Sequence, residues 1–219
     1  MLQGDTRRHR PRARVRVRDE ELVVQADPVV DTKLVKTAGE HWTCAMLARH
    51  GWAPALTRDG TERTDVLAVS TRLAHRPTIE VQVKAATQIG NRTTWPLNNK
   101  AQQPARSQHE WFVFVLLPAV PAPPRGFVVP RDHAAAAAWI VHQDWLTSPD
   151  VPEGRRNAPA SQARVHDGIW DGYEDRWDLL GAPTGDVAVL LPGSLRERAQ
   201  LDRVGLPPDH PWATRLPDW

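Results

Sequence analysis

Apolar and polar residues alternate most clearly between Thr78 and Ala85. Every second residue there is apolar, and the residues between them are Glu80, Gln82 and Lys84. This period of two is typical of a β-strand that packs one face on a core. The other face of the strand would then present a carboxylate, an amide and an ammonium group in a row. A solvated strand face gives the same pattern, so its interpretation depends on the rest of the chain.

Apolar patterns elsewhere predict a helix followed by several strands. The helix covers residues 29–50, where apolar side chains recur at three- and four-residue spacing: Leu34, Ala38, Trp42, Ala45 and Met46. Asp31 or Thr32 can cap its N-terminus, and Gly51 suits the position after its C-terminus. Strands are predicted at residues 52–57, 64–70, 78–86, 111–117 and 126–129. Short connections predict that the first three form an antiparallel meander.

The second half of the chain predicts a buried strand, a helix and an irregular extension. The fully apolar run at residues 111–117 indicates a central strand buried on both faces. Residues 131–143 predict a helix, and short helices are expected at residues 175–180 and 195–204. Four tryptophans of the C-terminal third are expected to serve packing: Trp170, Trp177, Trp212 and Trp219. The predicted organisation is a basic arm (residues 1–28), a core (29–146) and a C-terminal extension that packs on the core (147–219).

Composition places the chain among ordinary globular proteins, with 219 residues, 41% of them hydrophobic and 25% charged. No apolar run approaches the roughly 18–20 residues that a membrane span requires. The Arg-rich N-terminus also lacks the apolar segment of a secretory signal. We therefore expect a cytoplasmic protein without a membrane partner. The single cysteine, Cys44, excludes an intramolecular disulfide framework and a cysteine-based zinc site.

Positive charge is concentrated near the N-terminus, although the net charge is only +2. Seven arginines lie between Arg7 and Arg18, where apolar periodicity is absent, which predicts a disordered basic arm. Such an arm could contact nucleic acid phosphates or could be a solvated tail, and both interpretations stay open. Only four of the 28 basic residues are lysines, so Lys84 on a central strand is informative. A compact ammonium group can orient water in a way that a guanidinium group cannot.

The order of chemical groups along these elements resembles that of a nuclease superfamily. Glu40 lies in the first predicted helix, Asp65 opens the second predicted strand, and Gln82-Val83-Lys84 lies on the third. This helix–strand–strand–strand order resembles the PD-(D/E)XK superfamily, the fold of many restriction enzymes and Holliday-junction resolvases. The resemblance covers roughly residues 33–130. The chain departs from the pattern at Gln82, where an acidic residue is usual; some branches carry Gln there, and others with altered motifs have lost activity.

The resemblance implies an α/β fold with a restriction-endonuclease-like core, in which helices flank a central mixed β-sheet. It also implies a metal-dependent endonuclease that hydrolyses phosphodiester bonds in DNA, in defence or repair, with Mg²⁺ or Mn²⁺. Its catalytic residues would be Glu40, Asp65, Gln82 and Lys84. Metal ligands would come from Asp65, the Gln82 amide oxygen, the Val83 carbonyl and Glu40. Lys84 would orient or polarise the attacking water or stabilise developing negative charge.

Glu80 lies two residues before Gln82 on the same strand face, about 6–7 Å away at the rise of a β-strand. It could supply the carboxylate that Gln82 lacks. It could also lie beyond the metal and pair with an arginine, which is the favoured interpretation because Gln82 occupies the matching position of the motif.

Residues 87–110 form a long polar loop that could contact the nucleic acid. Arg92, Lys100 and Arg106 could bind phosphates. Trp95 could stack on an extruded base, although anchoring the loop is its favoured role.

Two other function classes compete with the nuclease. One is a catalytically inactive nuclease-fold module that binds nucleic acid, and the other is an interaction subunit whose strand face binds a protein. A DNA partner and a homodimer follow from the nuclease hypothesis, because a lone site cuts one strand and a two-fold dimer can cut both.

Deleting residues 1–26, most of the predicted arm, should weaken DNA binding and flatten its dependence on salt. Each phosphate that the arginines neutralise steepens the slope of log K against log salt concentration by about 0.9. Titrations of labelled DNA at several salt concentrations measure this slope, and the metal requirement should not change. An unchanged slope would identify the arm as a passive tail.

Overall fold

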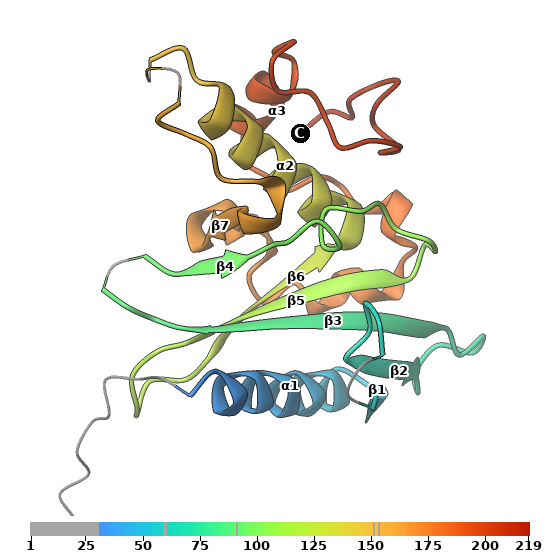
Figure 1. Ribbon diagram of the computed structural model, residues 1–219. Coiled ribbons are helices and arrows are strands. Elements are labelled where there is room, and N and C mark those ends of the chain that lie inside the picture. Colours follow the sequence, from blue (N-terminus) through green and yellow to red (C-terminus); the bar gives the residue numbers. More distant parts are fainter. Residues whose placement is uncertain (1–30, 59–60, 91, 151, 153) are drawn as a thin grey trace, which may run out of the picture.

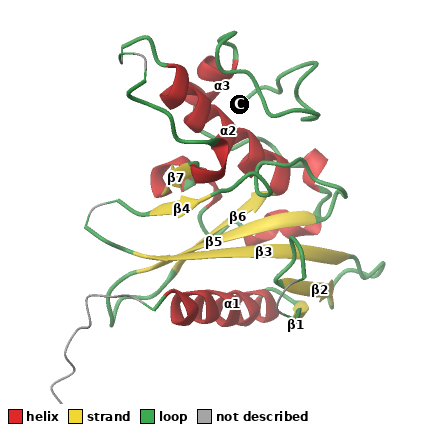
Figure 2. Ribbon diagram, in the orientation of Figure 1, coloured by secondary structure: helices red, strands yellow, loops and turns green. Residues whose placement is uncertain are grey.

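The computed structural model describes residues 31–58, 61–90, 92–150, 152 and 154–219, so the predicted basic arm lies outside the described residues. The fold is α/β, a mixed five-stranded sheet with helices on its two faces (Figures 1 and 2). The α-helices are α1 (Thr32–Arg49), α2 (Arg131–Thr147) and α3 (Gly193–Ala199). The strands are β1 (Trp52–Leu56), β2 (Val66–Ser70), β3 (Thr78–Thr87), β4 (Thr94–Pro96), β5 (Glu110–Leu117), β6 (Arg125–Pro130) and β7 (Arg164–His166).

The main sheet has the strand order β1-β2-β3-β5-β6. The predicted antiparallel meander is confirmed, because β1 pairs with β2 and β2 with β3, both antiparallel. β3 and β5 are parallel and pair from Glu80 and Glu110 to Thr87 and Leu117, and β6 returns antiparallel to β5. The connection from β3 to β5 contains β4, which pairs with β7 of the C-terminal extension in a separate two-stranded ribbon. We call this pair the β4–β7 ribbon.

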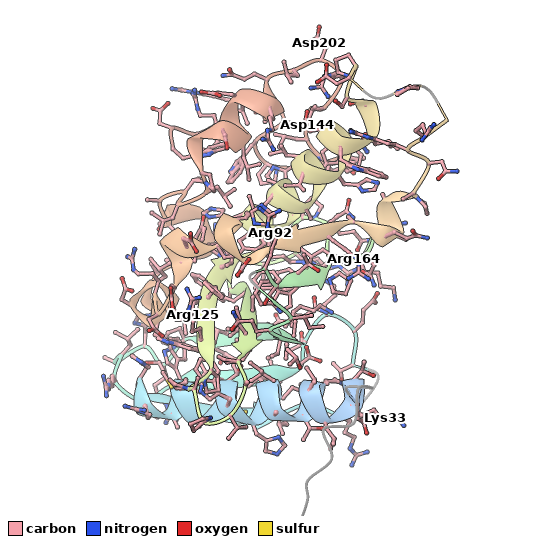
Figure 3. The ribbon with its side chains drawn as sticks, turned by 90° about the vertical axis from the view of Figure 1, so that its left-hand side faces the viewer. Lys33, Arg92, Arg125, Asp144, Arg164 and Asp202 are labelled. Carbon is pink, nitrogen blue, oxygen red and sulfur yellow. The ribbon has the colours of Figure 1, made fainter. Side chains whose placement is uncertain are left out.

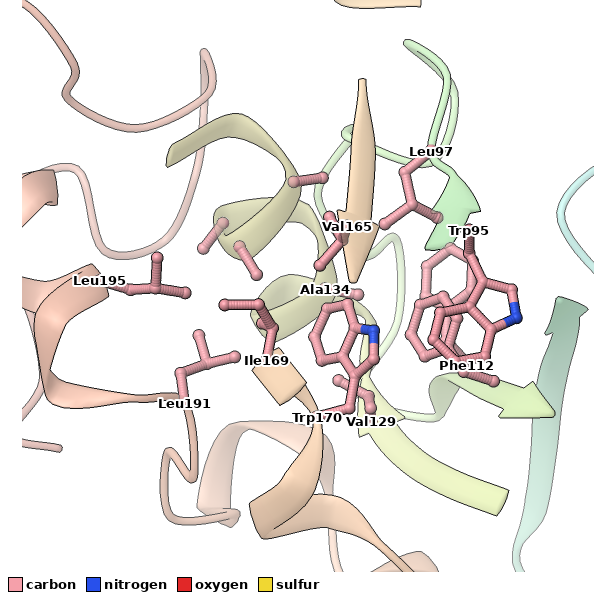
Figure 4. Packing of buried hydrophobic residues seen from close by; sticks show 14 of the residues in the cluster. Trp95, Leu97, Phe112, Val129, Ala134, Val165, Ile169, Trp170, Leu191 and Leu195 are labelled. Carbon is pink, nitrogen blue, oxygen red and sulfur yellow. The ribbon is translucent and has the colours of Figure 1, made fainter. Parts of the chain in front are cut away.

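The strand β5 is buried on both faces, as its apolar run predicted. Trp111, Val113 and Val115 pack on the α1 side of the sheet. Phe112 and Phe114 face the opposite side and pack with α2 and with the C-terminal extension (Figure 4). The extension contributes buried side chains from several short segments to this second cluster: Val165, Ile169, Trp170, Leu191 and Leu195.

Five short 3-10 helices give the extension most of its regular structure. They are η1 (Ala160–Gln162), η2 (Asp167–Ile169), η3 (Asp171–Tyr173), η4 (Trp177–Gly181) and η5 (Thr184–Asp186). The short helix predicted at residues 175–180 corresponds to η4, and the one predicted at 195–204 corresponds to α3, which starts and ends earlier. No helix among the described residues has the length and apolar character that crossing a membrane requires.

The ends of α1 follow the predicted capping residues. The Asp31 side chain accepts a hydrogen bond from the backbone N–H of Lys33 at 2.8 Å. Gly51 follows the helix with a φ of +83°, a left-handed conformation that glycine adopts without steric cost.

The predicted buried face of α1 was wrong in part. Leu34, Ala38 and Ala45 are exposed, and the buried residues are Gly39, Thr43 and Leu47. The physical reason is a close approach between the helix and β3. A Cβ atom added at Gly39 would lie 2.4 Å from the Cβ of Ala85. Glycine therefore occupies the position nearest the sheet, and the larger Trp42 and Met46 pack beside it.

Gly39→Ala should destabilise the protein, although alanine favours helix by about 1 kcal/mol over glycine. The added methyl has no space against Ala85, so we expect a net loss of about 1–3 kcal/mol in the free energy of unfolding, measured by denaturant titration. The double variant Gly39→Ala/Ala85→Gly should recover most of the loss. A stability gain in the single variant would contradict the close approach.

Candidate active site

The sheet opens along one edge of β3, because β2 is shorter than β3. The first residue of β2, Val66, lies opposite Val81, and the next hydrogen bond runs from Asp65 N to Val81 O at 2.9 Å. Beyond Val81, no strand among the described residues pairs with β3 on this side, although β3 continues to Thr87. Backbone groups of successive strand residues point to opposite sides. The N–H and C=O of Val83 therefore point, like those of Val81, to the side where β2 has ended.

The side chain of Asp65 takes over the hydrogen bonding of β3 where β2 has ended. Its Oδ2 accepts a hydrogen bond from the backbone N–H of Val83 at 2.8 Å, which satisfies a donor that the β2 ladder no longer reaches. Its own backbone N–H and C=O are held by Val81 and Thr57. The carboxylate is thus fixed in position. Within the described residues its second oxygen, Oδ1, has no hydrogen-bond partner.

A cavity of about 550 Å³ lies at this open edge. Asp65, Val83 and Lys84 line it together, so the structure brings these three predicted site residues to one place. The start of α1 forms one wall, and the β4–β7 ribbon forms the opposite wall.

Three further basic residues line the same cavity: Lys36, Arg92 and Arg164. Figure 3 shows Arg92 and Arg164 on one face of the molecule, above the beginning of α1 at Lys33. Four cationic side chains, with Lys84, therefore surround one carboxylate in this cavity.

The surroundings of Lys84 shift the pKa of its ammonium group. Burial lowers its pKa, the nearby Asp65 carboxylate raises it, and Arg131 and Lys36 lower it further. No ion pair or hydrogen bond holds this ammonium group within the described part of the chain. It is a partly desolvated cation beside a fixed carboxylate, which can orient water or stabilise developing negative charge.

Glu40 does not line the cavity. Its carboxylate lies 3.4 Å from the Nζ of Lys36, and only 16% of its side chain is exposed. It is therefore joined to the cavity through a lysine that does line it. The resemblance implied that Glu40 binds the metal directly or through water, and in the structure its carboxylate pairs with Lys36.

Gln82 and Glu80 are also engaged elsewhere. The Oε1 of Gln82, the atom expected to bind metal, accepts a hydrogen bond from Nη1 of Arg131 at 3.2 Å. The Oε2 of Glu80 accepts a hydrogen bond from the hydroxyl of Thr64 at 3.1 Å. Neither residue lines the cavity. The arginine partner favoured for Glu80 is absent among the described residues.

A buried charge cluster, which we did not predict, lies behind Gln82. Glu110 is 5% exposed and lies 2.7 Å from Arg63 and 3.4 Å from Arg131. Burial and the neighbouring Arg63 lower the pKa of Arg131 to about 10, so its guanidinium stays charged at neutral pH. This guanidinium also packs over the ring of Phe112, 5.0 Å from its centre. A glutamate directly before a fully apolar strand was the one sequence signal for this cluster.

The four residues predicted to contact nucleic acid lie in different parts of the structure. Arg92 lines the cavity, whereas Lys100 is an exposed lysine that pairs with Glu62 at 3.1 Å. Arg106 lines a separate cavity beside the start of α2. Trp95 is fully buried and packs against Phe114 and Phe127, so it anchors the ribbon and cannot stack on a base. Arg164 was missed, because nothing local in the sequence shows that β7 pairs with β4.

The donor set fits a weakly held Mg²⁺ ion. No group of three or more His, Cys, Asp or Glu side chains among the described residues could hold a metal. Mg²⁺, however, is often bound through one or two carboxylates, with waters and substrate phosphates completing its shell. The free Oδ1 of Asp65 and the carbonyl of Val83 are oxygen donors of the kind that this ion prefers.

Comparisons with protein-family models, with curated proteins and with solved structures found no match to this chain.

Asp65→Asn should lower the pKa of Lys84 further, because it removes the charge that opposes the effect of burial. NMR titration of isotope-labelled lysine side chains measures this pKa, and with four lysines in the chain the signals are readily assigned. Asp186→Asn, an exposed change in η5, should leave the titration of Lys84 unaltered. An unchanged or raised pKa in Asp65→Asn would show that the two groups are not coupled.

Proposed function

We propose that this protein is a metal-dependent nuclease of the PD-(D/E)XK type that hydrolyses phosphodiester bonds in DNA. The observation that carries the proposal is the convergence of Asp65, Val83 and Lys84 at one cavity on the open edge of β3. The element order α1-β1-β2-β3 supports it, since it repeats the helix–strand–strand–strand order of the resemblance.

The basic residues of the cavity suit a phosphodiester substrate. Lys36, Arg92 and Arg164 supply positive charge from α1, from the segment before β4 and from β7. They would bind phosphates on both sides of the bond that is cut, and would position the strand without reading its sequence. Among the described residues, none of those that line the cavity is Asn or Gln, the residue types that pair with base edges, so these lining residues favour contacts with the nucleic acid backbone.

Asp65 and Lys84 would perform the chemistry. The Oδ1 of Asp65 and the Val83 carbonyl would hold Mg²⁺, which lowers the pKa of a bound water and neutralises phosphate charge. Lys84 lies beside the carboxylate, where its ammonium group would orient the attacking water and stabilise the charge that develops on the phosphate oxygens. Asp65 is held by Val83 N–H, so its free oxygen is already positioned before substrate arrives.

This assignment differs from the pattern implied by the resemblance at two positions. Gln82 would support the site indirectly, as the acceptor for Arg131, rather than bind the metal. Glu40 would act through its ion pair with Lys36. The proposed protein ligand set is therefore reduced to Asp65 and Val83.

One observation favours a second candidate function, a nuclease-fold module that binds nucleic acid without cutting it. Asp65 is the one carboxylate among the described residues that line the cavity, against four basic side chains. A site with this balance would bind phosphates with or without a metal.

Asp65→Asn and Lys84→Gln should each reduce Mg²⁺-dependent DNA cleavage at least 100-fold, since each removes a group that touches water or metal. Single-turnover assays on duplex, single-stranded and branched DNA measure the rate. Lys33→Gln is the matched control, because Lys33 lies on the same turn of α1 as Lys36 without lining the cavity. DNA binding without cleavage by the wild type, with any divalent metal, would support the binding module instead.

A further inference from the structure

A second cavity, of about 340 Å³, adjoins the candidate active site. It lies between the end of α2 and the segment that leads into β7, and its lining includes His142, Trp145, Gln162 and Arg164. Arg164 lines both cavities, so the two share this residue. In Figure 3, Arg164 and Asp144, which precedes Trp145 on α2, lie on the same face of the molecule.

Trp145 gives this cavity an accessible aromatic surface. It is 41% exposed, although a tryptophan of α2 could have been buried against the sheet or α3. The guanidinium of Arg156 lies 5.6 Å from the centre of its ring, and Arg156 also donates a hydrogen bond to the Trp145 carbonyl. This pairing holds the indole in place and adds a positive charge beside it.

His142 supplies an unsatisfied polar group beside Trp145. Its ring lies 5.8 Å from that of Trp145, and the residue is only 6% exposed. Its Nε2 is buried without a hydrogen-bond partner, and Nδ1 has no partner among the described residues either. A buried polar group without a partner lowers stability unless water or a ligand satisfies it. The cavity thus combines an aromatic face, a cation and an unused hydrogen-bonding ring.

These features fit a nucleobase. Every base has a flat π-face that stacks on aromatic side chains, and guanidinium groups add cation–π attraction. The edge of a base offers donors and acceptors that the amide of Gln162 can meet. The volume of about 340 Å³ suits one base with its sugar and is too small for a duplex.

We propose that this cavity binds one unpaired base of the DNA strand whose phosphates lie in the neighbouring cavity. The inference rests on the proposed function for its choice of ligand. Arg164 would contact the phosphate that joins the nucleotide on Trp145 to the nucleotide at Asp65 and Lys84. The substrate would therefore include an unpaired nucleotide next to the bond that is cut, as in a single strand, an overhang or a branch.

The test measures binding of labelled single-stranded DNA in EDTA, where metal-dependent cleavage does not occur. Trp145→Ala should weaken binding roughly 5- to 150-fold, the range for loss of one stacked base, and Trp145→Phe should retain most of the affinity. Leu201→Ala is the matched control, since Leu201 is 40% exposed and lines neither cavity. Thermal unfolding of each variant shows that the fold is intact.

A second measurement locates the base. A series of oligonucleotides carries one abasic site, each at a different position along the strand. The wild type should bind them equally well except for the one whose abasic site falls at Trp145, which should bind more weakly. This position dependence should vanish in Trp145→Ala, because the variant has no stacking to lose. If the abasic site weakened binding equally in Trp145→Ala and in the wild type, the proposal would be overturned. It would also be overturned if Trp145→Ala bound intact DNA as tightly as the wild type does. Competition by a free deoxynucleotide as effective as the strand would overturn the strand assignment.

The outcomes separate this inference from the proposed function. If Trp145→Ala weakens binding as expected but the wild type cleaves no DNA, the base site stands and the nuclease assignment fails. If the wild type cleaves DNA while Trp145→Ala binds and cleaves normally, the nuclease stands and the base site fails. A wild type that binds no DNA overturns both.

Discussion

The unequal length of β2 and β3 is the constraint on which the candidate site depends. A strand that loses its neighbour exposes backbone N–H and C=O groups that must find other partners. Asp65 satisfies the first of them, the N–H of Val83, and its carboxylate is fixed by the same bond. The end of the β2 ladder therefore creates three things together: a held carboxylate, a carbonyl directed to the open edge, and space beside Lys84. A longer β2 would pair Val83 and close this space.

The sequence predicted most of the fold and part of the site, and the failures have a common cause. Periodicity and capping residues located α1 and the five strands of the main sheet within about three residues, because these signals are local. The buried face of α1 was wrong in part, because Gly39 carries no hydrophobic signal and is buried by the approach of β3. Asp65 and Lys84 were predicted from the order of chemical groups along the predicted helix and strands. Arg164 could not be predicted, since its place follows from pairing between β4 and a segment far along the chain. Trp95 is buried, in keeping with the anchoring role favoured for it.

The buried charge cluster gives Gln82 a structural role that depends on its being uncharged. Arg131 donates to Gln82 and is paired with Glu110, which also binds Arg63. Removing one partner of such a buried pair leaves a charge uncompensated, typically at about 3–5 kcal/mol. The amide of Gln82 accepts from Arg131 without adding charge to the cluster. A carboxylate at this position would be attracted to the same guanidinium, so position 82 belongs to the core of this protein as much as to its open edge.

The β4–β7 ribbon also sets the order in which the cavity can form during synthesis. The meander and α1 are complete once residue 87 has been made, but the strand that pairs with β4 ends at His166. At about 5–20 residues per second, the ribosome needs on the order of 4–16 s to make the intervening chain. Throughout this interval the nascent protein carries Asp65 and Lys84 on an open edge that lacks Arg164 and the wall beneath it. The complete cavity thus forms only after residue 166 has been synthesised, so Asp65 and Lys84 are in place well before the opposite wall of the cavity.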